Sequence, residues 1–482
     1  MTAKPRSAAA ARRLLAPILI LCVLAAGTSA GAGAAGDSAA SLTQRVDAIV
    51  AAEMRRQKVP GVAIGVVRAG RVILARGYGE ANVEHRVPVT RETVFQSGSV
   101  GKQFTAVAVM LEVEDGKLAL DDPITKYLPA APSGWARITI RNLLTHTSGV
   151  ATYSSKDVNL RGDYSEDELL KMAYALPLEF EPGSRWSYSN TGYMLLGIIL
   201  HRVSGKFYGD ILRDRVFAPL GMKSARIISE ADIVRNRSAG YQLLDGDLKN
   251  QDWVSPTLNT TADGALYLSL NDYLAWDRGL RAGALLRPES WSAIYTAVTL
   301  KSGRTYPYGF GWEVDRALGE PWYYHSGSWQ GFRTFISRYL ADDLTVIVLA
   351  NLADAMPVRF VDGITRVIDS RLPRLELDTA IADHNPEITE RVRVLLRSVG
   401  AGTLSAQDLP AMRRDFFPEE LQACKELLAP LTAPARLELL ERRELGDDLR
   451  YSYRAVFPQR TLFVAMTLTP ENQVADVEIE PR

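Results

Sequence analysis

Apolar residues recur along the chain with two different periods, and each period predicts one kind of element. A spacing of three or four residues predicts amphipathic helices over residues 42–57, 99–115 and about 357–371. The middle helix has the strongest pattern, because Gly116 closes it and its apolar residues share one face. These residues are Val100, Phe104, Val107 and Leu111.

Runs rich in β-branched residues predict strands near both ends of residues 36–372. Residues 62–67 and 72–75 flank Ala69-Gly70 and predict a hairpin. Three further strands are expected later, at residues 310–314, 334–339 and 344–349. Because the middle mixes short helices with loops, we expect one antiparallel sheet assembled from both ends of this segment, with a helical insertion between them.

A small α+β domain is predicted at the C-terminus, residues 387–482, after a linker at residues 373–386. Amphipathic helices are expected near 388–398 and 418–429, ahead of four β-like runs. The runs cover residues 435–442, 449–457, 461–468 and 473–480 and predict an antiparallel meander. The preceding domain is expected to span residues 36–372.

Residues 1–35 have the features of a secretion signal. Basic residues precede an apolar run over residues 14–26, and small residues at 30–34 offer cleavage sites. The run is shorter than a bilayer-spanning helix needs, although an uncleaved N-terminal anchor is the alternative. Cys22 follows the bulky Leu21, which argues against a lipoprotein. We therefore expect a secreted or periplasmic protein without a transmembrane segment once the signal is removed.

Composition narrows the classes of function. Of the 482 residues, 47% are hydrophobic and 23% charged, as in a globular protein, and Lys+Arg equals Asp+Glu at 56 each. This balance argues against nucleic-acid binding, which favours a basic excess. Two cysteines and five scattered histidines fit neither a disulfide framework nor the common zinc motifs. The sequence therefore implies no metal and no organic cofactor.

Ser99-Val100-Gly101-Lys102 opens the predicted helix over residues 99–115, and it is the strongest chemical signal in the chain. Lys102 lies one turn after Ser99 on the same helix face, so both side chains can point at one site. A serine hydroxyl needs a neighbouring base, and a buried lysine whose pKa is lowered can serve as that base. An N-capping serine followed by a solvated lysine is the alternative.

Tyr188-Ser189-Asn190 follows a Pro-Gly turn, and we expect it in a loop. A tyrosine hydroxyl can pass a proton between nucleophile and leaving group if nearby cations lower its pKa. An asparagine amide can hold a substrate carbonyl and also bond a lysine. The alternative is a turn with a packed tyrosine.

His325-Ser326-Gly327-Ser328 is expected just before a strand. Glycine there lets a ligand approach the backbone, and the N–H of Ser328 could donate to an oxyanion. A competing triplet, Lys301-Ser302-Gly303, is rejected because no strand pattern follows it directly. A hydrogen-bonded core histidine is the alternative reading of His325.

In this order, the motifs resemble those of the serine β-lactamase and penicillin-binding-protein superfamily: Ser-x-x-Lys, Tyr-x-Asn, then Lys/His-Ser/Thr-Gly. The match goes beyond these triplets: residues 95–106 and 143–150 are similar to the class C branch and its esterase and D-amino-acid peptidase relatives, and the runs Pro219–Met222 and Tyr308–Trp312 agree as well. The resemblance covers about residues 40–372. It implies a β-lactamase/transpeptidase-like α+β fold, with an antiparallel sheet flanked by helices and a helical subdomain.

The resemblance also implies a role for each motif residue. Ser99 is the expected nucleophile, Lys102 its base, and Tyr188 the proton shuttle. The remaining residues are expected to bind substrate: Asn190 orients it, His325 and Gly327 line the opposite wall, and the N–H groups of Ser99 and Ser328 form the oxyanion hole. His146 also lies in a motif, but the Thr-Ser-Gly after it predicts a turn, so we interpret it as structural.

The implied function is a secreted serine hydrolase that cleaves an ester or amide through an acyl-enzyme on Ser99. A β-lactam, a D-amino-acid peptide or a carboxylic ester fits this chemistry, so the expected partner is a small molecule or a peptide. His325 replaces the lysine that penicillin-hydrolysing relatives use, which favours an esterase or D-peptidase over a true β-lactamase. The alternative is a non-catalytic or slowly deacylating protein that binds penicillin or cell-wall peptides.

Overall fold

The computed structural model describes residues 30–229, 231–258, 261–417, 420–431 and 433–481, with side chains from Ser41 onward. Most of the predicted leader, residues 1–29, lies outside this range. The chain divides into two units, residues 1–44 and 45–482, and the sheets and the candidate site all belong to the second. No helix within the described ranges is both long and apolar enough to cross a membrane.

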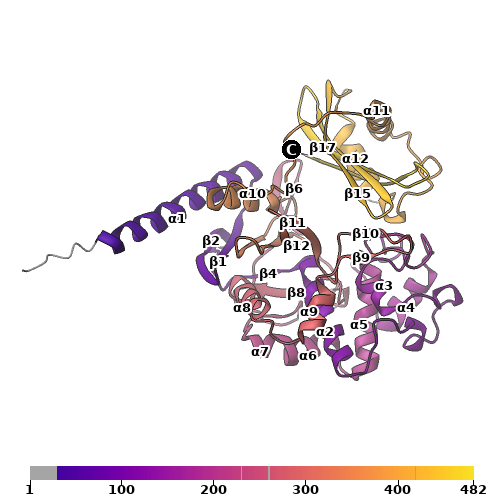
Figure 1. Ribbon diagram of the computed structural model, residues 1–482, viewed down its shortest axis with the longest axis horizontal. Helices are drawn as coiled ribbons and strands as arrows, with labels where there is room; N and C mark the ends of the chain where they lie inside the picture. The colour runs from indigo at the N-terminus through magenta and orange to yellow at the C-terminus, as the bar shows by residue number, and fades with distance from the viewer. Residues whose placement is uncertain (1–29, 230, 259–260, 418–419, 432, 482) are drawn as a thin grey trace, which may run out of the picture. The chain divides into compact units, whose positions relative to one another are not determined.

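A seven-stranded antiparallel sheet forms the centre of the larger unit, in the order β11-β12-β13-β14-β1-β2-β3 (Figure 1). Strand β1 from the start of this unit pairs with β14 from near its end, with Val62 opposite Ala350. The predicted assembly of one sheet from both ends is therefore confirmed. The strands are β1 (Gly61–Arg68), β2 (Arg71–Asn82), β3 (Val87–Pro88), β11 (Glu313–Ala317), β12 (Glu320–Trp329), β13 (Phe332–Tyr339) and β14 (Leu344–Ala350).

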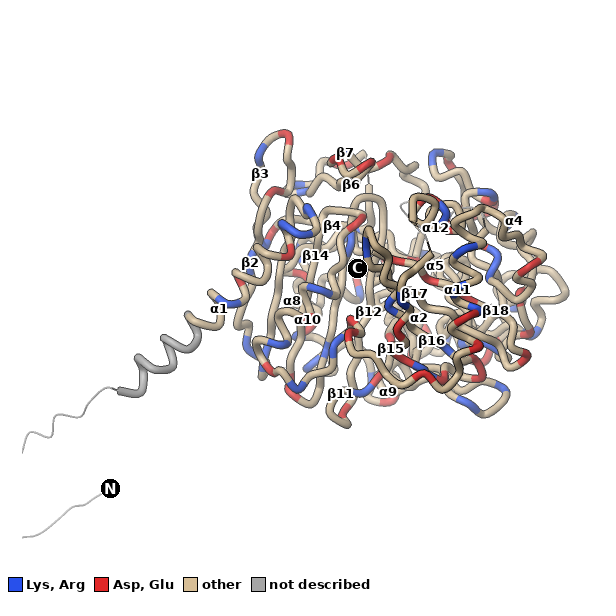
Figure 2. The backbone as a smooth tube through the Cα atoms, turned by 90° about the horizontal axis from the view of Figure 1, so that it is seen from above, with Lys and Arg blue, Asp and Glu red and all other residues tan. Residues whose placement is uncertain are grey.

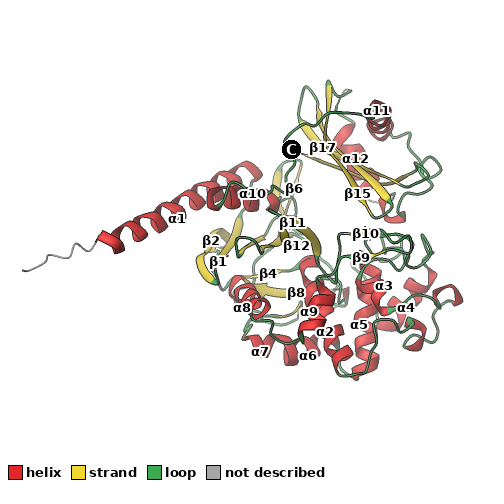
Figure 3. Ribbon diagram, viewed as in Figure 1, coloured by secondary structure: helices red, strands yellow, loops and turns green. Residues whose placement is uncertain are grey.

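Helices cover this sheet and form the insertion between its two halves (Figure 3). The predicted helix is present as α2, and its nine-residue run Lys102–Met110 is buried on every face, as are Leu111 and Glu112, so α2 is a central helix. The helices are α1 (Ala30–Gln57), α2 (Lys102–Glu114), α3 (Ile140–Leu144), α4 (Glu166–Ala175), α5 (Asn190–Ser204), α6 (Tyr208–Leu212), α7 (Ala218–Leu220), α8 (Leu270–Arg281), α9 (Pro288–Ile294) and α10 (Pro357–Ile368).

Smaller sheets lie within the insertion. A three-stranded sheet has the order β4-β8-β5, and two hairpins pair β6 with β7 and β9 with β10. Their bounds are β4 (Val94–Gln96), β5 (Arg226–Ile227), β6 (Tyr241–Leu244), β7 (Asp247–Asn250), β8 (Leu266–Ser269), β9 (Val298–Thr299) and β10 (Thr305–Tyr306). Strand β4 leads directly into the turn that carries Ser99, so this sheet positions the candidate nucleophile.

Two strand predictions need correction. The predicted strand at 310–314 begins only at Glu313, because the N–H of Gly309 donates to the carbonyl of Trp312 and closes a turn. Strand β12 has no counterpart in the sequence prediction, which expected the His325 motif before a strand. Its turn-forming serines and glycine hide the strand pattern, yet it pairs with β13 over eight residues, from Trp322 to Trp329. The motif therefore lies inside a strand.

The C-terminal segment has a hydrophobic core of its own. Four strands run antiparallel in chain order, so the predicted meander is confirmed. Two helices share its core, and residues 373–385 contain neither helix nor strand, while the linker at residues 373–386 stays a prediction. The elements are α11 (Pro386–Ala401), α12 (Glu420–Leu428), β15 (Arg436–Leu445), β16 (Asp448–Val456), β17 (Thr461–Leu468) and β18 (Val474–Pro481).

Charged residues of both signs are interspersed over the described backbone (Figure 2). Some of them join the C-terminal segment to the rest of the unit. Arg414 binds Asp157 through two hydrogen bonds of 2.6 and 2.7 Å, and its backbone N–H donates to Glu179 at 2.8 Å. Arg185 binds Asp448 at 2.9 Å. The Arg414–Asp157 contact is the strongest of these, because its two parallel hydrogen bonds fix the orientation of both side chains.

We expect the Arg414–Asp157 pair to be energetically coupled. A double-mutant cycle of Arg414→Ala and Asp157→Ala, measured by urea denaturation, should give a coupling free energy of about 1 kcal/mol, because the pair is bidentate but partly exposed. Arg460→Ala, at an exposed arginine, is the control and should show no coupling with Asp157. A cycle that closes within about 0.3 kcal/mol for Arg414 would contradict the expectation.

Candidate active site

Ser99 lies in a tight 3-10 turn, η1 (Gly98–Gly101), between β4 and α2. Gly98 has φ +51°, and a Cβ atom there would lie 2.5 Å from the backbone nitrogen of Ser328. The turn therefore packs directly against β12, with no room for a side chain. This packing brings the first and third motifs together, and it puts the N–H of Ser328 beside the turn that carries Ser99.

Lys102 is fully buried, at 0% exposure, at the first residue of α2. Its Nζ lies 3.1 Å from Ser99 Oγ, 2.8 Å from Asn190 Oδ1 and 2.5 Å from the backbone carbonyl of Asp263. Burial lowers the pKa of Lys102 to about 7, and the nearby negative charge of Asp263 opposes this shift. The alternative of a solvated lysine is therefore excluded.

These three contacts fit both states of the amine: the ammonium form donates to all three oxygens, and the neutral form can keep the same geometry. Two N–H groups can donate to the carbonyl oxygens of Asn190 and Asp263, and the lone pair can accept from the Ser99 hydroxyl. Because the pKa of Lys102 is about 7, this state is well populated at neutral pH. The arrangement can therefore take a proton from Ser99.

The second motif straddles the start of α5. Tyr188 precedes the helix as predicted, but Asn190 is its first residue, and Ser189 caps it by accepting from the N–H of Gly192 at 3.1 Å. The N–H of Asn190 donates to Thr152 Oγ1 at 2.8 Å. The cap fixes the direction of the Asn190 side chain, which bonds Lys102.

Tyr188 has a buried hydroxyl without a regular hydrogen-bond partner among the described residues. Burial raises the pKa of Tyr188 well above its usual value, while the nearby Ser99 hydroxyl acts in the opposite direction. The Nζ of Lys102 lies 4.9 Å from the centre of the tyrosine ring. The condition that cations lower this pKa is therefore not met, and Tyr188 is present as the neutral phenol.

The third motif lies on β12, against the turn that carries Ser99. A Cβ atom at Gly327 would lie 2.1 Å from the carbonyl oxygen of Ser97 and 2.3 Å from Thr334 Oγ1, so only glycine fits. His325 is buried and Ser328 is exposed. The rejected triplet at Lys301 lies in a turn, and its side chain pairs with Glu181.

A chain of hydrogen bonds links the second and third motifs. The N–H of Ser189 donates to His146 Nδ1 at 3.0 Å, and His146 Nε2 lies 3.3 Å from the hydroxyl of Tyr308. That hydroxyl lies 3.0 Å from His325 Nε2, and His325 Nδ1 lies 2.6 Å from the carbonyl of Ser326. The two ends assign the tautomers: His146 donates from Nε2, Tyr308 donates to His325 Nε2, and His325 donates from Nδ1.

The two histidines of this hydrogen-bond series, His146 and His325, are neutral. Burial lowers the pKa of His146 well below its usual range and that of His325 to about 3, and the charge of Lys102 acts in the same direction on both. His146 thus has the structural part expected of it, but its partner Tyr308 was not singled out as a site residue. The signal that could have found Tyr308 is its place in the Tyr308–Trp312 run.

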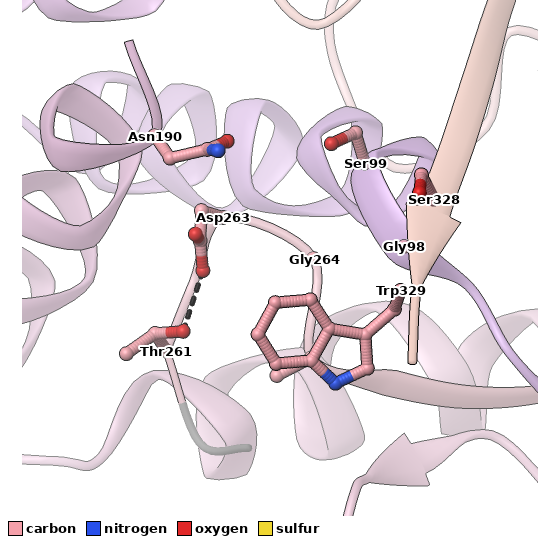
Figure 4. A pocket seen from close by; sticks show the side chains of 9 residues that line it. Gly98, Ser99, Asn190, Thr261, Asp263, Gly264, Ser328 and Trp329 are labelled. Atoms are coloured by element: carbon pink, nitrogen blue, oxygen red, sulfur yellow. Dashed lines mark hydrogen bonds between the residues drawn. The ribbon is translucent and has the colours of Figure 1, made fainter. Parts of the chain in front are cut away.

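The open pocket brings together Ser99, Asn190 and Ser328 from the three motifs. The pocket is not lined by the other motif residues, which are Lys102, Tyr188, His325 and Gly327. Lys102 lies behind Ser99, where its Nζ contacts Ser99 Oγ. Figure 4 shows a further part of the lining, which sequence reasoning missed, since no motif covers it. Its residues are Thr261, Asp263, Gly264, Ala265 and Trp329.

Comparison with known proteins agrees with this geometry. The family model described as Beta-lactamase matches residues 46–367. The chain is 29% identical over 307 residues to penicillin-binding protein 4* of Bacillus subtilis, covering 58% of this chain and 66% of the relative. It is 28% identical over 326 residues to a D-aminopeptidase of Gluconobacter oxydans, covering 66% and 61%. The chain thus spans just under two thirds of the length of these relatives.

A solved structure extends the likeness beyond the matched family region. The octameric penicillin-binding protein homologue from Pyrococcus abyssi has a TM-score of 0.59 at 22% identity, and the match covers 91% of this chain and 98% of that one. Coverage of this extent includes part of the C-terminal segment. The predicted β-lactamase/transpeptidase-like fold is therefore confirmed.

The burial of Lys102 predicts a pH-dependent stability. Between pH 7 and about 10 the unfolded state binds the Lys102 proton that the folded state has lost, so stability rises with pH in this window. From pH 7 to 9 the free energy of unfolding should rise by about 2 kcal/mol relative to Lys102→Met, measured by urea denaturation. Lys171→Met, at an exposed lysine of α4, is the control. An equal pH dependence of wild type and Lys102→Met would refute the lowered pKa.

Proposed function

The chain belongs to the beta-lactamase family, and on this premise we propose that it is a serine hydrolase that cleaves an amide or ester through an acyl-enzyme on Ser99. The observation that carries the proposal is the contact of 3.1 Å between Ser99 Oγ and Nζ of Lys102, a buried amine whose pKa is about 7. A weak nucleophile with a neutral base in hydrogen-bond reach is the arrangement that acyl transfer requires.

In the proposed acylation, Lys102 accepts the proton of the Ser99 hydroxyl as Oγ attacks the substrate carbonyl. The N–H groups of Ser99 and Ser328 stabilise the oxyanion, a role supported by the close packing of Ser328 against Gly98. The C–O or C–N bond then breaks, and the leaving group takes up a proton. Tyr188 suits this step, because a neutral phenol can donate its proton to the leaving group while it accepts the one held by Lys102.

Deacylation reverses the same proton transfers. Water attacks the acyl carbonyl, Tyr188 and Lys102 remove its proton, and the C–O bond to Ser99 breaks as the proton returns to Oγ. Asn190 holds the Lys102 amine throughout and orients the substrate carbonyl. The expected substrate is a small molecule or a peptide, and no further group is needed to balance the reaction.

His325 is unsuited to bind the carboxylate group of a substrate. Its Nε2 accepts from Tyr308 and its Nδ1 donates to the carbonyl of Ser326, so neither nitrogen has a proton to offer a ligand. Its pKa of about 3 also leaves it uncharged. We therefore favour an esterase or an amino-acid amidase and aminopeptidase over a true β-lactamase or a carboxypeptidase.

The second candidate is a binder of penicillin or cell-wall peptides that deacylates slowly or not at all. The appended C-terminal segment motivates it, because a second domain suits recognition of a larger partner. Export to the periplasm or the exterior remains our proposal, and it rests only on the sequence of residues 1–35.

Ester turnover separates the two candidates. The purified chain should release p-nitrophenol from p-nitrophenyl acetate, and Ser99→Ala should reduce kcat at least about 10³-fold, because the nucleophile is lost. Ser302→Ala, in the exposed turn of the rejected triplet, should retain the wild-type rate. A stable acyl adduct on Ser99 in mass spectrometry, without turnover, would favour the binder. Equal rates in wild type and Ser99→Ala would sink the hydrolase proposal.

A further inference from the structure

Asp263 puts a carboxylate into the lining of the pocket that also contains the candidate nucleophile. It is 7% exposed and lines the pocket together with Ser99 and Asn190 (Figure 4). Its backbone carbonyl accepts from the same Nζ of Lys102 that contacts Ser99 Oγ. The side chain has no part in the acyl transfer described above, so its place in the pocket needs another explanation.

Among the described residues, the hydrogen-bond partners of the Asp263 carboxylate are both neutral. Tyr153 donates to Oδ2 at 2.8 Å and Thr261 donates to Oδ1 at 2.5 Å. Burial raises the pKa of Tyr153 well above its usual value, so that hydroxyl keeps its proton. Within the described ranges no lysine or arginine forms an ion pair with Asp263, and Lys102 bonds its backbone carbonyl instead.

A buried carboxylate without a cationic partner is destabilised, and each of its oxygens can accept a second hydrogen bond. A cation on the ligand would satisfy both needs in the pocket. The α-amino group of an amino acid has this charge, and its nitrogen lies about 2.5 Å from the carbonyl carbon by standard bond lengths and angles. A substrate carbonyl at Ser99 would therefore carry its ammonium group only a short way across the pocket.

We propose that Asp263 binds the protonated α-amino group of the acyl moiety, so that preferred substrates are amides of amino acids or peptides with a free N-terminal amine. The inference rests on the proposed hydrolase function and adds its substrate class. His325 fits the same class, because neither of its ring nitrogens has a proton to offer a substrate carboxylate. Asp263 thus acts as a specificity-determining residue, and the chemistry at Ser99 is unchanged.

The test compares substrates that differ only at the α-substituent. The full chain is assayed with alanine p-nitroanilide, N-acetylalanine p-nitroanilide and the lactic acid p-nitroanilide, each as D and L forms. In one stereochemical series, kcat/KM should be at least tenfold higher for the free amine than for either neutral analogue. In Asp263→Asn this preference should disappear, because the free amine and its two neutral analogues then meet the same uncharged side chain.

Asp272→Asn is the matched control, since Asp272 is a buried aspartate that caps α8 outside the pocket and its loss should leave the substrate preference intact.

A measurement on the wild type keeps the test valid if Asp263→Asn does not fold. For the free amine alone, kcat/KM should fall as pH rises through the pKa of the substrate amine, which is near 8 for an α-amino group.

The outcomes separate the two proposals. Ester turnover that depends on Ser99, with no preference for the free amine in either series, would overturn the role of Asp263 and leave the hydrolase intact. An equal loss of all substrates in Asp263→Asn would also overturn it, because Asp263 would then act through Lys102. Ester turnover that is independent of Ser99 would instead defeat the hydrolase proposal itself.

Discussion

The Nζ of Lys102 is the point on which the site depends, because three separate segments of chain must meet there. Ser99 comes from the turn before α2, Asn190 from the start of α5, and the Asp263 carbonyl from the segment before β8. A fully buried amine is strongly destabilised unless its hydrogen-bonding capacity is met. When folding provides hydrogen-bond partners for Nζ, it therefore also brings the nucleophile, the base and the pocket wall into contact. The same burial lowers the pKa of the amine, so that it can act as a base near neutral pH.

The C-terminal segment reaches this site through a short series of contacts. Arg414 holds Asp157, which in turn accepts from the N–H and hydroxyl of Ser154. The residues just before Ser154 bond the start of α5 and the pocket acid: Thr152 accepts from Asn190, and Tyr153 donates to Asp263. The segment thus supports one wall of the pocket, which gives it a physical connection to the site, although none of its described residues lines the pocket.

The wall at β12 is held by neutral groups. His146, Tyr308 and His325 form a directed series of hydrogen bonds whose ends are backbone groups of Ser189 and Ser326. Because burial and the charge of Lys102 both disfavour the imidazolium form, the series keeps one set of tautomers over the neutral pH range. The only carboxylate lining the pocket, as far as the chain is described, is then Asp263, and this sets the electrostatic character of the pocket.

The sequence alone determined the features that depend on local spacing and order. The period of apolar residues predicted the hairpin at Ala69-Gly70, the helix after Ser99 and the C-terminal meander. It also brought Ser99 and Lys102 onto one helix face, and the order of the three motifs indicated the family. These inferences work because helix and strand periods are properties of neighbouring residues.

Only the tertiary structure decided the features that depend on contacts between distant segments. Strand β12 continues through the third motif because β13 offers it a partner, although the stretch Ser326-Gly327-Ser328 favours turns. The pKa shifts of Lys102 and Tyr188 follow from burial, which no local pattern measures. Asp263 and Tyr308 belong to no recognised triplet, and they reach the site only because the chain folds back on η1 and β12. Their roles rest on what surrounds them in space, and for that reason the sequence could not reveal them.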